Sequence, residues 1–331
     1  MSTPRSAASS RADVVRAAFA EDVGYYLRQT PRQLPSRYLY DTLGSSLFEA
    51  ICRLPWYEIT RTEQHLLAAH GSEIFRRLRG VANVVELGPG SGEKLVTLLR
   101  ANPGRDVAVH LVDVSGAALA KAAANLSALP AQRVETHETM YEDGLQSVCD
   151  RLAPGERTLA LFLGSNLGNF DPPGADALLH SIRAAIGPGS ALLLGTDLVK
   201  PEPELLLAYD DPLGVTAAFN RNLLVRVNRE LGGDFDIDHF AHRAVWNPAH
   251  ARIEMHLVSG RDQRVRVAAA DIDVTFASGE PIWTESSYKY EATAIAPMAA
   301  RAGFSVIGQW IDRRYAITLL EATPASVADV P

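Results

Sequence analysis

The stretch VVELGPGSGEK, residues 84–94, is an apolar run that ends at Glu86 and is followed by three glycines. The apolar run predicts a buried β-strand, and the residues from Lys94 onward have the spacing of a helix. Gly88, Gly90 and Gly92 lie between them, where glycine permits backbone angles closed to other residues and lets a ligand approach. The stretch therefore predicts a strand, a ligand-binding turn and a helix, as in α/β folds.

The spacing of these glycines and of a second carboxylate indicates which ligand the turn suits. The glycines read G-x-G-x-G, whereas dinucleotide folds read G-x-G-x-x-G, with a third glycine for helix packing. Asp113 ends the next apolar run, where a carboxylate that binds a ribose belongs. This combination suits S-adenosylmethionine, which needs no phosphate cradle. The alternative is a tight turn in another α/β protein, and we favour the cofactor.

The same strand–turn–helix pattern recurs along the chain. Apolar strands are expected at 82–88, 107–113, 157–164 and 190–200. Four such units with helices between them predict a parallel, doubly wound sheet, and the unbroken apolar run 159–163 is typical of a strand buried on both faces.

The pattern changes after residue 200. Residues 202–235 have helical spacing, and 251–290 alternate as antiparallel strands do. The segment 298–322 reads as helix, strand, turn and strand. We therefore expect an α/β fold with a Rossmann-like sheet and a second, α+β domain.

Composition excludes several classes of protein. The 331 residues carry a net charge of −7, which argues against a general binder of nucleic acid. Only Cys52 and Cys149 are present, as in a reducing compartment. No apolar run reaches the ~18–20 residues that span a membrane, and the N-terminus lacks the apolar segment of a secretory signal. We expect a cytoplasmic protein whose residues 1–12 are disordered.

Two segments place polar groups where a ligand could meet them. In PIWTESSYKY, residues 281–290, alternation puts Glu285, Ser287 and Lys289 on the face that carries Trp283, either at a solvent edge or in a pocket. In FLGSNLGNF, residues 162–170, Ser165, Asn166 and Asn169 follow a strand at its carboxyl end, where open α/β sheets bind ligands. Asn169 either contacts a substrate or caps the next helix, and the residues leave both open.

These segments together resemble the L-histidine Nα-methyltransferases of ergothioneine biosynthesis, a family with fungal relatives that act on tryptophan derivatives. The resemblance covers about residues 34–320. Its motifs are YDTLGSSLFEAICRLP (40–55), VELGPGSGEK (85–94), FLGSNLGNF (162–170), LLLGTDLVK (192–200), AYDDPLGVTAAFNRN (208–222), NRELGGDFD (228–236) and TESSYKY (284–290). It implies a class I S-adenosylmethionine-dependent methyltransferase domain at 61–197 and 289–331, and a substrate-binding domain at 13–60 and 198–288.

The resemblance also implies roles for individual residues. Tyr40 and Phe48 are expected beside the reacting amine, as catalytic aromatic faces that favour its growing positive charge. The expected cofactor contacts are Gly88, Gly90, Lys94, Asp113, Tyr40, Met140 and Tyr141. The expected substrate contacts are Asn169 and Tyr209 for the carboxylate, and Tyr57, Glu285 and Ser287 for the imidazole, with Met255 close by.

Three positions depart from the family's pattern. Asn166 stands where members of the ergothioneine pathway often have Thr, and Glu58 replaces a Tyr next to Tyr57. Met140 and Tyr141 replace an Asp–Phe pair that contacts adenine, so Glu138, Thr139 or water must accept the adenine amino hydrogens.

The expected activity is trimethylation of the α-amino group of L-histidine to hercynine by a monomer. Alternatives are a paralogue that methylates another amino acid or amine, and a non-catalytic sensor of an amino acid or of the cofactor. No metal is expected, because the nine histidines show neither H-x-x-x-H nor a spacing of two histidines and one carboxylate.

Overall fold

The computed structural model describes residues 6–78, 80–102, 107–129, 133–153 and 155–324, with side chains from residue 13 onward. The chain divides into a smaller unit, residues 1–57 and 201–286, and a larger unit, residues 58–200 and 287–331. The boundaries expected from the sequence, at 60/61, 197/198 and 288/289, lie near these. The assignment of the units to substrate and cofactor stays a proposal.

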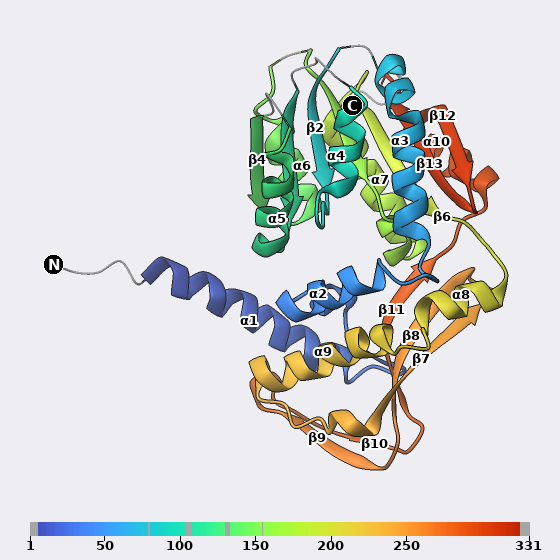
Figure 1. Ribbon diagram of the computed structural model, residues 1–331. Coiled ribbons are helices and arrows are strands. Elements are labelled where there is room, and N and C mark those ends of the chain that lie inside the picture. Colours follow the sequence, from blue (N-terminus) through green and yellow to red (C-terminus); the bar gives the residue numbers. More distant parts are fainter. Residues whose placement is uncertain (1–5, 79, 103–106, 130–132, 154, 325–331) are drawn as a thin grey trace. The chain divides into compact units, whose positions relative to one another are not determined.

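The larger unit is built on a seven-stranded sheet with the order β12-β13-β6-β5-β2-β3-β4 (Figure 1). Neighbours from β6 to β4 are parallel, and β13 is antiparallel to both β6 and β12. The strands are β2 (Val81–Leu87), β3 (Ala108–Asp113), β4 (Arg133–Glu138), β5 (Arg157–Phe162), β6 (Ala191–Asp197), β12 (Phe304–Asp312) and β13 (Tyr315–Ala322). The predicted doubly wound sheet is confirmed.

Helices cover both faces of this sheet. They are α3 (Ile59–Arg77), α4 (Glu93–Arg100), α5 (Gly116–Leu126), α6 (Tyr141–Cys149), α7 (Pro172–Ile186) and α10 (Ile295–Arg301), with the short turns η2 (Asn166–Asn169) and η5 (Ala292–Ala294). A fully buried apolar core joins α6, α7 and α10 to β2, β5, β6 and β13. The run Leu159–Leu163 is buried throughout, as predicted for a strand covered on both faces.

The edge strand β4 was missed in the sequence. Its residues Arg133–Glu138 are half-buried or exposed, and only Val134 is aliphatic. Natural sheets often blunt an edge with charged side chains, which protects it from pairing with another chain. That same composition removes the apolar signal by which the other parallel strands were found.

The smaller unit combines a four-stranded sheet, of order β1-β11-β8-β7, with a β-hairpin, β9–β10, and four helices. The strands are β1 (Arg32–Gln33), β7 (Phe240–Asn247), β8 (Arg252–Ser259), β9 (Gln263–Val267), β10 (Ile272–Phe276) and β11 (Pro281–Tyr288). The helices are α1 (Ser6–Tyr26), α2 (Thr42–Ile51), α8 (Glu202–Tyr209) and α9 (Val215–Leu231), with turns η1 (Ser36–Leu39), η3 (Ile237–His239) and η4 (Ala268–Ala270).

Sequence patterns predicted most of the smaller unit. The pairs β7–β8 and β9–β10 are antiparallel, in accord with the alternation from residue 251, although β7 was not predicted. Helix α1 begins at Ser6, so the expectation of disorder is wrong for residues 6–12, while residues 1–5 lie outside the described residues.

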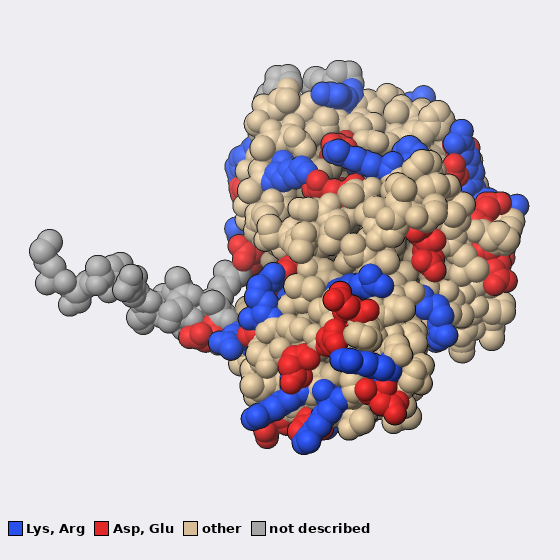
Figure 2. Space-filling model, turned by 60° about the horizontal axis from the view of Figure 1, so that its bottom comes forward, with Lys and Arg blue, Asp and Glu red and all other residues tan. Residues whose placement is uncertain are grey.

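On the face shown in Figure 2, basic and acidic side chains are intermixed and separated by uncharged surface. This face therefore carries no broad basic field of the kind that holds nucleic acid. Within the described residues, no helix combines the length and the apolar character needed to cross a membrane.

Candidate active site

The glycine turn after β2 brings three predicted residues together. Gly88 has a φ of 74°, and its N–H donates to the carbonyl of Val112 at 2.9 Å. A Cβ on Gly88 would lie 3.0 Å from the hydroxyl of Tyr141 and 3.1 Å from Nδ2 of Asn166. Gly90, with a φ of 54°, has open space where its Cβ would be. The turn thus presents bare backbone beside an aromatic hydroxyl and a carboxamide.

Two carboxyl groups lie at the ends of the neighbouring strands β2 and β3, close to this turn. Glu86 is buried, and burial raises its pKa to about 8 although the nearby Lys94 ammonium acts against that rise. Its Oε2 has no hydrogen-bond partner among the described residues. Burial also raises the pKa of Asp113, while backbone N–H groups, including that of Ser115 at 2.9 Å, act to lower it. The edge therefore carries two carboxyl groups with spare acceptor capacity.

Lys94 is held by a carboxylate that the sequence did not reveal. Its Nζ lies 2.6 Å from Oε2 of Glu63, a fully buried residue of α3. Glu63 also accepts from the backbone N–H of Gly164 at 2.9 Å and from the hydroxyl of Tyr315 at 2.6 Å. The predicted contact of Lys94 with the cofactor stays a prediction, but its ammonium is anchored at the carboxyl ends of the strands.

The turn after β5 shows whether Asn169 caps the following helix. Helix α7 is capped by Asp171, whose carboxylate accepts from the N–H of Gly174 at 2.9 Å. The alternative that Asn169 caps this helix is therefore wrong. Asn169 is exposed at the end of η2, while Ser165 is buried and its Oγ accepts from the N–H of Asp197 at 2.9 Å. A substrate role for Asn169 remains a prediction.

Residues 285–289 lie at the end of β11 and just beyond it, and their burial shows whether the face that carries Glu285 is a solvent edge. Glu285, Ser287 and Lys289 are 9%, 5% and 4% exposed, so the reading of this face as a solvent edge is wrong. Lys289 Nζ donates to Oγ of Ser287 at 2.9 Å and lies 3.0 Å from Oδ2 of Asp197. Lys200 contacts the other oxygen of Asp197 at 2.6 Å. Lys289 is thus a direct partner of a predicted substrate residue.

In the smaller unit, the predicted aromatic residues form one cluster. Ring centroids are 5.5 Å apart for Tyr40 and Phe48, 6.3 Å for Phe48 and Tyr57, and 6.2 Å for Tyr57 and Tyr209. Phe219 of α9 joins Tyr40 at 5.5 Å and Phe48 at 6.0 Å. Phe219 was not predicted, although it lies in a quoted motif. Such a set of ring faces suits a cation.

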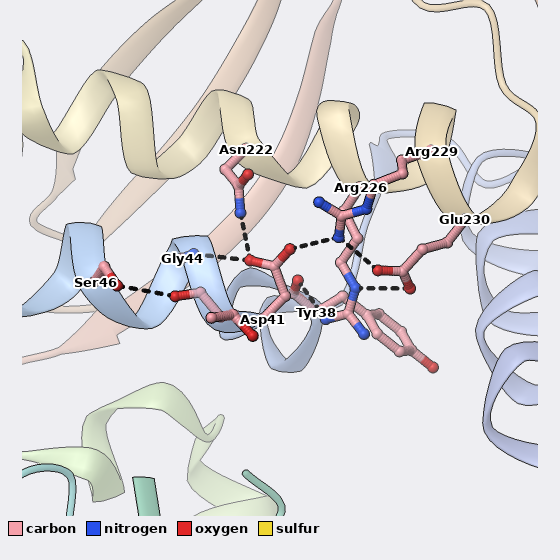
Figure 3. Close-up of polar contacts among 9 residues, drawn as sticks. Tyr38, Asp41, Gly44, Ser46, Asn222, Arg226, Arg229 and Glu230 are labelled. Atoms are coloured by element: carbon pink, nitrogen blue, oxygen red, sulfur yellow. Dashed lines mark hydrogen bonds and ion pairs between the residues drawn. The ribbon is translucent and has the colours of Figure 1, made fainter. Parts of the chain in front are cut away.

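Asp41 fixes the helix that carries Phe48. As the N-cap of α2, its Oδ1 accepts from the N–H of Gly44 and from Nδ2 of Asn222, each at 2.7 Å (Figure 3). Its Oδ2 accepts from Arg229 at 2.7 Å. Burial alone would raise the pKa of Asp41, but the hydrogen bonds from Arg229, Gly44 and Asn222 lower it overall. An Asp directly before a helical segment is a capping signal that could have identified this residue.

A second polar contact fixes Tyr209 at the end of α8. The backbone carbonyl of Tyr209 accepts from Nε2 of the buried His242 at 2.8 Å, and Nδ1 of His242 lies 3.0 Å from Nδ2 of Asn220. A carbonyl can only accept and a carboxamide nitrogen can only donate. His242 is therefore the neutral tautomer with its proton on Nε2.

The remaining predicted substrate residues of this unit lie on neighbouring strands. Met255 on β8 is buried, and its carbonyl accepts from Oγ1 of Thr284 at 3.0 Å. Trp283 donates from Nε1 to the carbonyl of Glu285 at 2.9 Å. Strands β8 and β11 are neighbours in the sheet, which places Met255 and Glu285 on adjacent chains.

Two of the positions that depart from the family are at the surface. Met140 is 51% exposed and directly precedes α6. Glu58 precedes α3, and its Oε1 lies 3.6 Å from Nη1 of Arg313, both in the larger unit. The predicted adenine contact of Met140 stays a prediction.

The sheet order, the glycine turn and the carboxylates at the strand ends define a class I methyltransferase fold. Residues 19–323 match the family model described as histidine-specific methyltransferase, SAM-dependent. The chain belongs to this family of S-adenosylmethionine-dependent methyltransferases.

Two curated relatives are consistent with that membership. The chain is 41% identical to histidine N-alpha-methyltransferase of Mycobacterium tuberculosis (strain CDC 1551 / Oshkosh), over 91% of this chain and 93% of that protein. It is 40% identical to the protein of the same name from Mycolicibacterium smegmatis, with the same coverage. An O-methyltransferase family protein from Burkholderia thailandensis superposes with a TM-score of 0.45 at 16% identity, covering 96% of this chain and 71% of that one.

Proposed function

We propose that the protein transfers three methyl groups from S-adenosylmethionine to the α-amino group of L-histidine. The product is hercynine, and the reaction is the first step of ergothioneine biosynthesis. The observation that carries this proposal is the match of residues 19–323 to a histidine-specific family. The names of the two mycobacterial relatives, and of the Neurospora crassa relative called ergothioneine biosynthesis protein 1, support it.

The carboxyl edge of the larger unit fits the cofactor. The bare backbone at Gly88 and Gly90 leaves room for a ligand that a side chain would exclude. Asp113 provides an acceptor for ribose hydroxyls, and Oε2 of Glu86, which has no hydrogen-bond partner among the described residues, offers a further polar atom at this edge. Tyr141, packed at 5.5 Å from Phe162, offers an aromatic face at the same turn. When bound there, S-adenosylmethionine supplies an electrophilic methyl group.

The predicted substrate residues are divided between the units. Tyr57, Tyr209, Met255 and Glu285 belong to the smaller unit, and Asn169 and Ser287 to the larger. The histidine amine must be neutral to react, and desolvation lowers the pKa of an ammonium group. Ring faces such as those of Tyr40 and Phe48 favour a product that gains a permanent positive charge, by about 0.5–2 kcal/mol each.

Selectivity is assigned to the buried Glu285. A carboxylate accepts a hydrogen bond from a ligand that brings an N–H donor, and such a bond to a charged group contributes roughly 1.5–3 kcal/mol. Imidazole provides that donor and an aliphatic side chain does not, so a site of this kind rejects aliphatic amino acids by about 10⁴-fold. Glu285→Ala should therefore weaken histidine binding strongly and leave cofactor binding unchanged. Calorimetry that shows unaltered histidine affinity in this variant would contradict the assignment.

The decisive experiment is an incubation of the protein with S-adenosylmethionine and a panel of amino acids, followed by mass spectrometry. A mass increase of three methyl groups on histidine alone supports the proposal. Methylation of another amino acid instead would indicate a paralogue, for which Asn166 and Met140 leave room. Absence of turnover on every amino acid would favour a sensor. We further propose a cytoplasmic location, because Cys52 and Cys149 form no disulfide, and a monomer, as the family resemblance implies.

A further inference from the structure

We propose that His110, Glu135 and His137 bind a divalent transition-metal ion, and that Zn²⁺ is the ion that suits them best. The three residues lie on β3 and β4 of the larger unit, and each offers one ligand atom within 4.8 Å of the other two. Two imidazoles and a carboxylate form a set that zinc commonly takes in proteins, with water completing the coordination.

Two of the three distances between the ligand atoms are near those of a zinc site. His110 Nδ1 lies 3.3 Å from His137 Nε2 and 3.7 Å from Oε2 of Glu135. Ligand atoms bound at about 2.0–2.1 Å in a tetrahedral arrangement are separated by roughly 3.3 Å. The third pair, Glu135 and His137, lies within 4.8 Å, and both side chains are half-exposed.

The backbone builds this arrangement. In the parallel pairing of β3 and β4, His110 stands opposite Glu135, and Val112 opposite His137. Because side chains alternate along a strand, His110 and Val112 share one face, and their partners share it too. Val112 faces Gly144, so this is the face that α6 covers. Figure 1 shows β4 at the edge of the sheet, where an ion can enter from solvent.

The orientation of the His110 ring is compatible with a metal ion bound at Nδ1. The side chain is 6% exposed, and its Nε2 has no hydrogen-bond partner among the described residues. His137 and Glu135 both lie beside Nδ1 of the ring. A neutral histidine that binds a metal through one nitrogen carries its proton on the other, which here is Nε2.

Two guanidinium groups lower the affinity expected of this site for a metal ion. Arg133 donates to Oε1 of Glu135 from Nε at 3.1 Å and from Nη2 at 2.8 Å, which leaves Oε2 directed toward His110. Arg151, which follows α6, acts electrostatically on all three ligands. Both positive charges oppose a cation and make the site weaker than a closed structural zinc site.

The ion would stabilise the edge strand β4 and take no part in methyl transfer. Asp113, at the cofactor edge, is three residues beyond His110 on β3, a separation of about 10 Å at ~3.3 Å per residue. An ion that binds only the folded chain stabilises it in proportion to the logarithm of its concentration over the Kd. It would tie β4 to β3 through side chains from both strands.

The test is calorimetric titration of the intact protein with Zn²⁺ at pH 7.5, alongside His137→Gln and Glu135→Gln. Each variant should bind Zn²⁺ at least ~10-fold more weakly, since even outer partners of a metal site change affinity by 10–100-fold. The matched control is His180→Gln on α7, an exposed histidine whose replacement should leave Zn²⁺ affinity unchanged. Equal affinity in the parent and in both cluster variants would mean adventitious binding and would overturn the proposal.

A spectroscopic measurement on the unaltered chain keeps the proposal testable if a variant does not fold. Co²⁺ should give the intense visible absorption of tetrahedral nitrogen and oxygen ligation, and Zn²⁺ should displace it. A weak octahedral spectrum, or the charge-transfer bands of a thiolate from Cys52 or Cys149, would overturn the assignment. Neither readout depends on methyl transfer, so failure here is distinguishable from failure of the proposed function.

Discussion

Lys289 donates a hydrogen bond from Nζ to Oγ of Ser287 at 2.9 Å, and both side chains are buried. An ammonium group has donors only, so Ser287 must accept this bond through its oxygen, and its own hydroxyl hydrogen is directed elsewhere. In the proposed enzyme, this bond fixes the position of the Ser287 hydroxyl that is predicted to contact the imidazole.

The first prediction concerns this pair. Lys289→Met should raise the Kd for histidine about tenfold, because a hydrogen bond to a charged group contributes roughly 1.5–3 kcal/mol, and should leave the Kd for S-adenosylmethionine unchanged. Binding of both ligands is measured by calorimetry. In a Ser287→Ala background the same change should have little further effect, since the two residues act through one bond.

Lys200→Met is the matched control, because Lys200 contacts the other oxygen of the same carboxylate, Asp197 Oδ1, at 2.6 Å. This variant also loses an ion pair with Asp197, so it should show any effect of that loss. Its affinity for histidine should stay unchanged. If Lys289→Met weakens histidine binding equally with and without Ser287, Lys289 has only a structural role.

A second prediction concerns the N-cap of α2. Asp41→Ala removes the acceptor for Gly44, Asn222 and Arg229, and we expect it to lower the free energy of unfolding by about 1–2 kcal/mol, as lost caps do. Asp41→Asn keeps a side-chain acceptor and loses only the charge facing the half-exposed Arg229, so it should cost much less. Urea unfolding of both variants measures the difference, and equal losses would show that the charge outweighs the cap.

The parts of the fold that sequence predicted are those in which burial is continuous. Strands β5 and β6 carry the unbroken apolar runs 159–162 and 191–194 because helices cover both faces, and they were located from those runs. Edge strand β4 has no such run, since one of its sides has no partner strand. The proposed metal ligands on β3 and β4 were also missed, because His110 and His137 are distant in sequence and adjacent only through strand pairing.

The sequence proposes residues for the site, but it does not reveal the residues that hold them in place. Alternation placed Ser287 and Lys289 on one face, yet burial of that face depends on the rest of the fold. Glu63 and His242 hold Lys94 and the carbonyl of Tyr209, each from an element far away in the sequence. Spacing along the chain carries no information about such contacts.

A third prediction follows from the buried Glu86, whose pKa is raised to about 8, chiefly by burial. The folded chain holds this proton up to about pH 8, whereas the unfolded chain releases it near the ordinary value of about 4.3. The stabilising contribution is therefore greatest below the unfolded pKa and is lost as the pH rises toward 8, by up to ~1.4 kcal/mol per pH unit.

Glu86→Gln removes this titration with little change in shape. The free energy of unfolding of the variant, relative to that of the parent, should rise between about pH 5 and pH 8 in the absence of cofactor. Urea unfolding at several pH values measures it. A difference that stays constant across this range would show that Glu86 is ionised in the folded chain throughout.

The last prediction concerns His242, which donates to the carbonyl of Tyr209 and accepts from Asn220. Burial lowers its pKa, although the Tyr209 carbonyl acts in the opposite direction. The unfolded chain therefore binds this proton first, and the associated stability is present above the unfolded pKa of about 6.5 and is lost as the pH falls below it. His242→Leu should abolish this component and cost about 1–3 kcal/mol at pH 7.5, because two buried polar groups lose their partner.

The same substitution should also weaken histidine binding through Tyr209 while cofactor affinity is kept. His180→Leu, at an exposed histidine of α7, is the control for a general effect of the substitution. A His242→Leu chain whose stability declines from pH 7.5 to 5 as steeply as that of the parent, by the same urea titration, would show that another histidine carries the acid sensitivity.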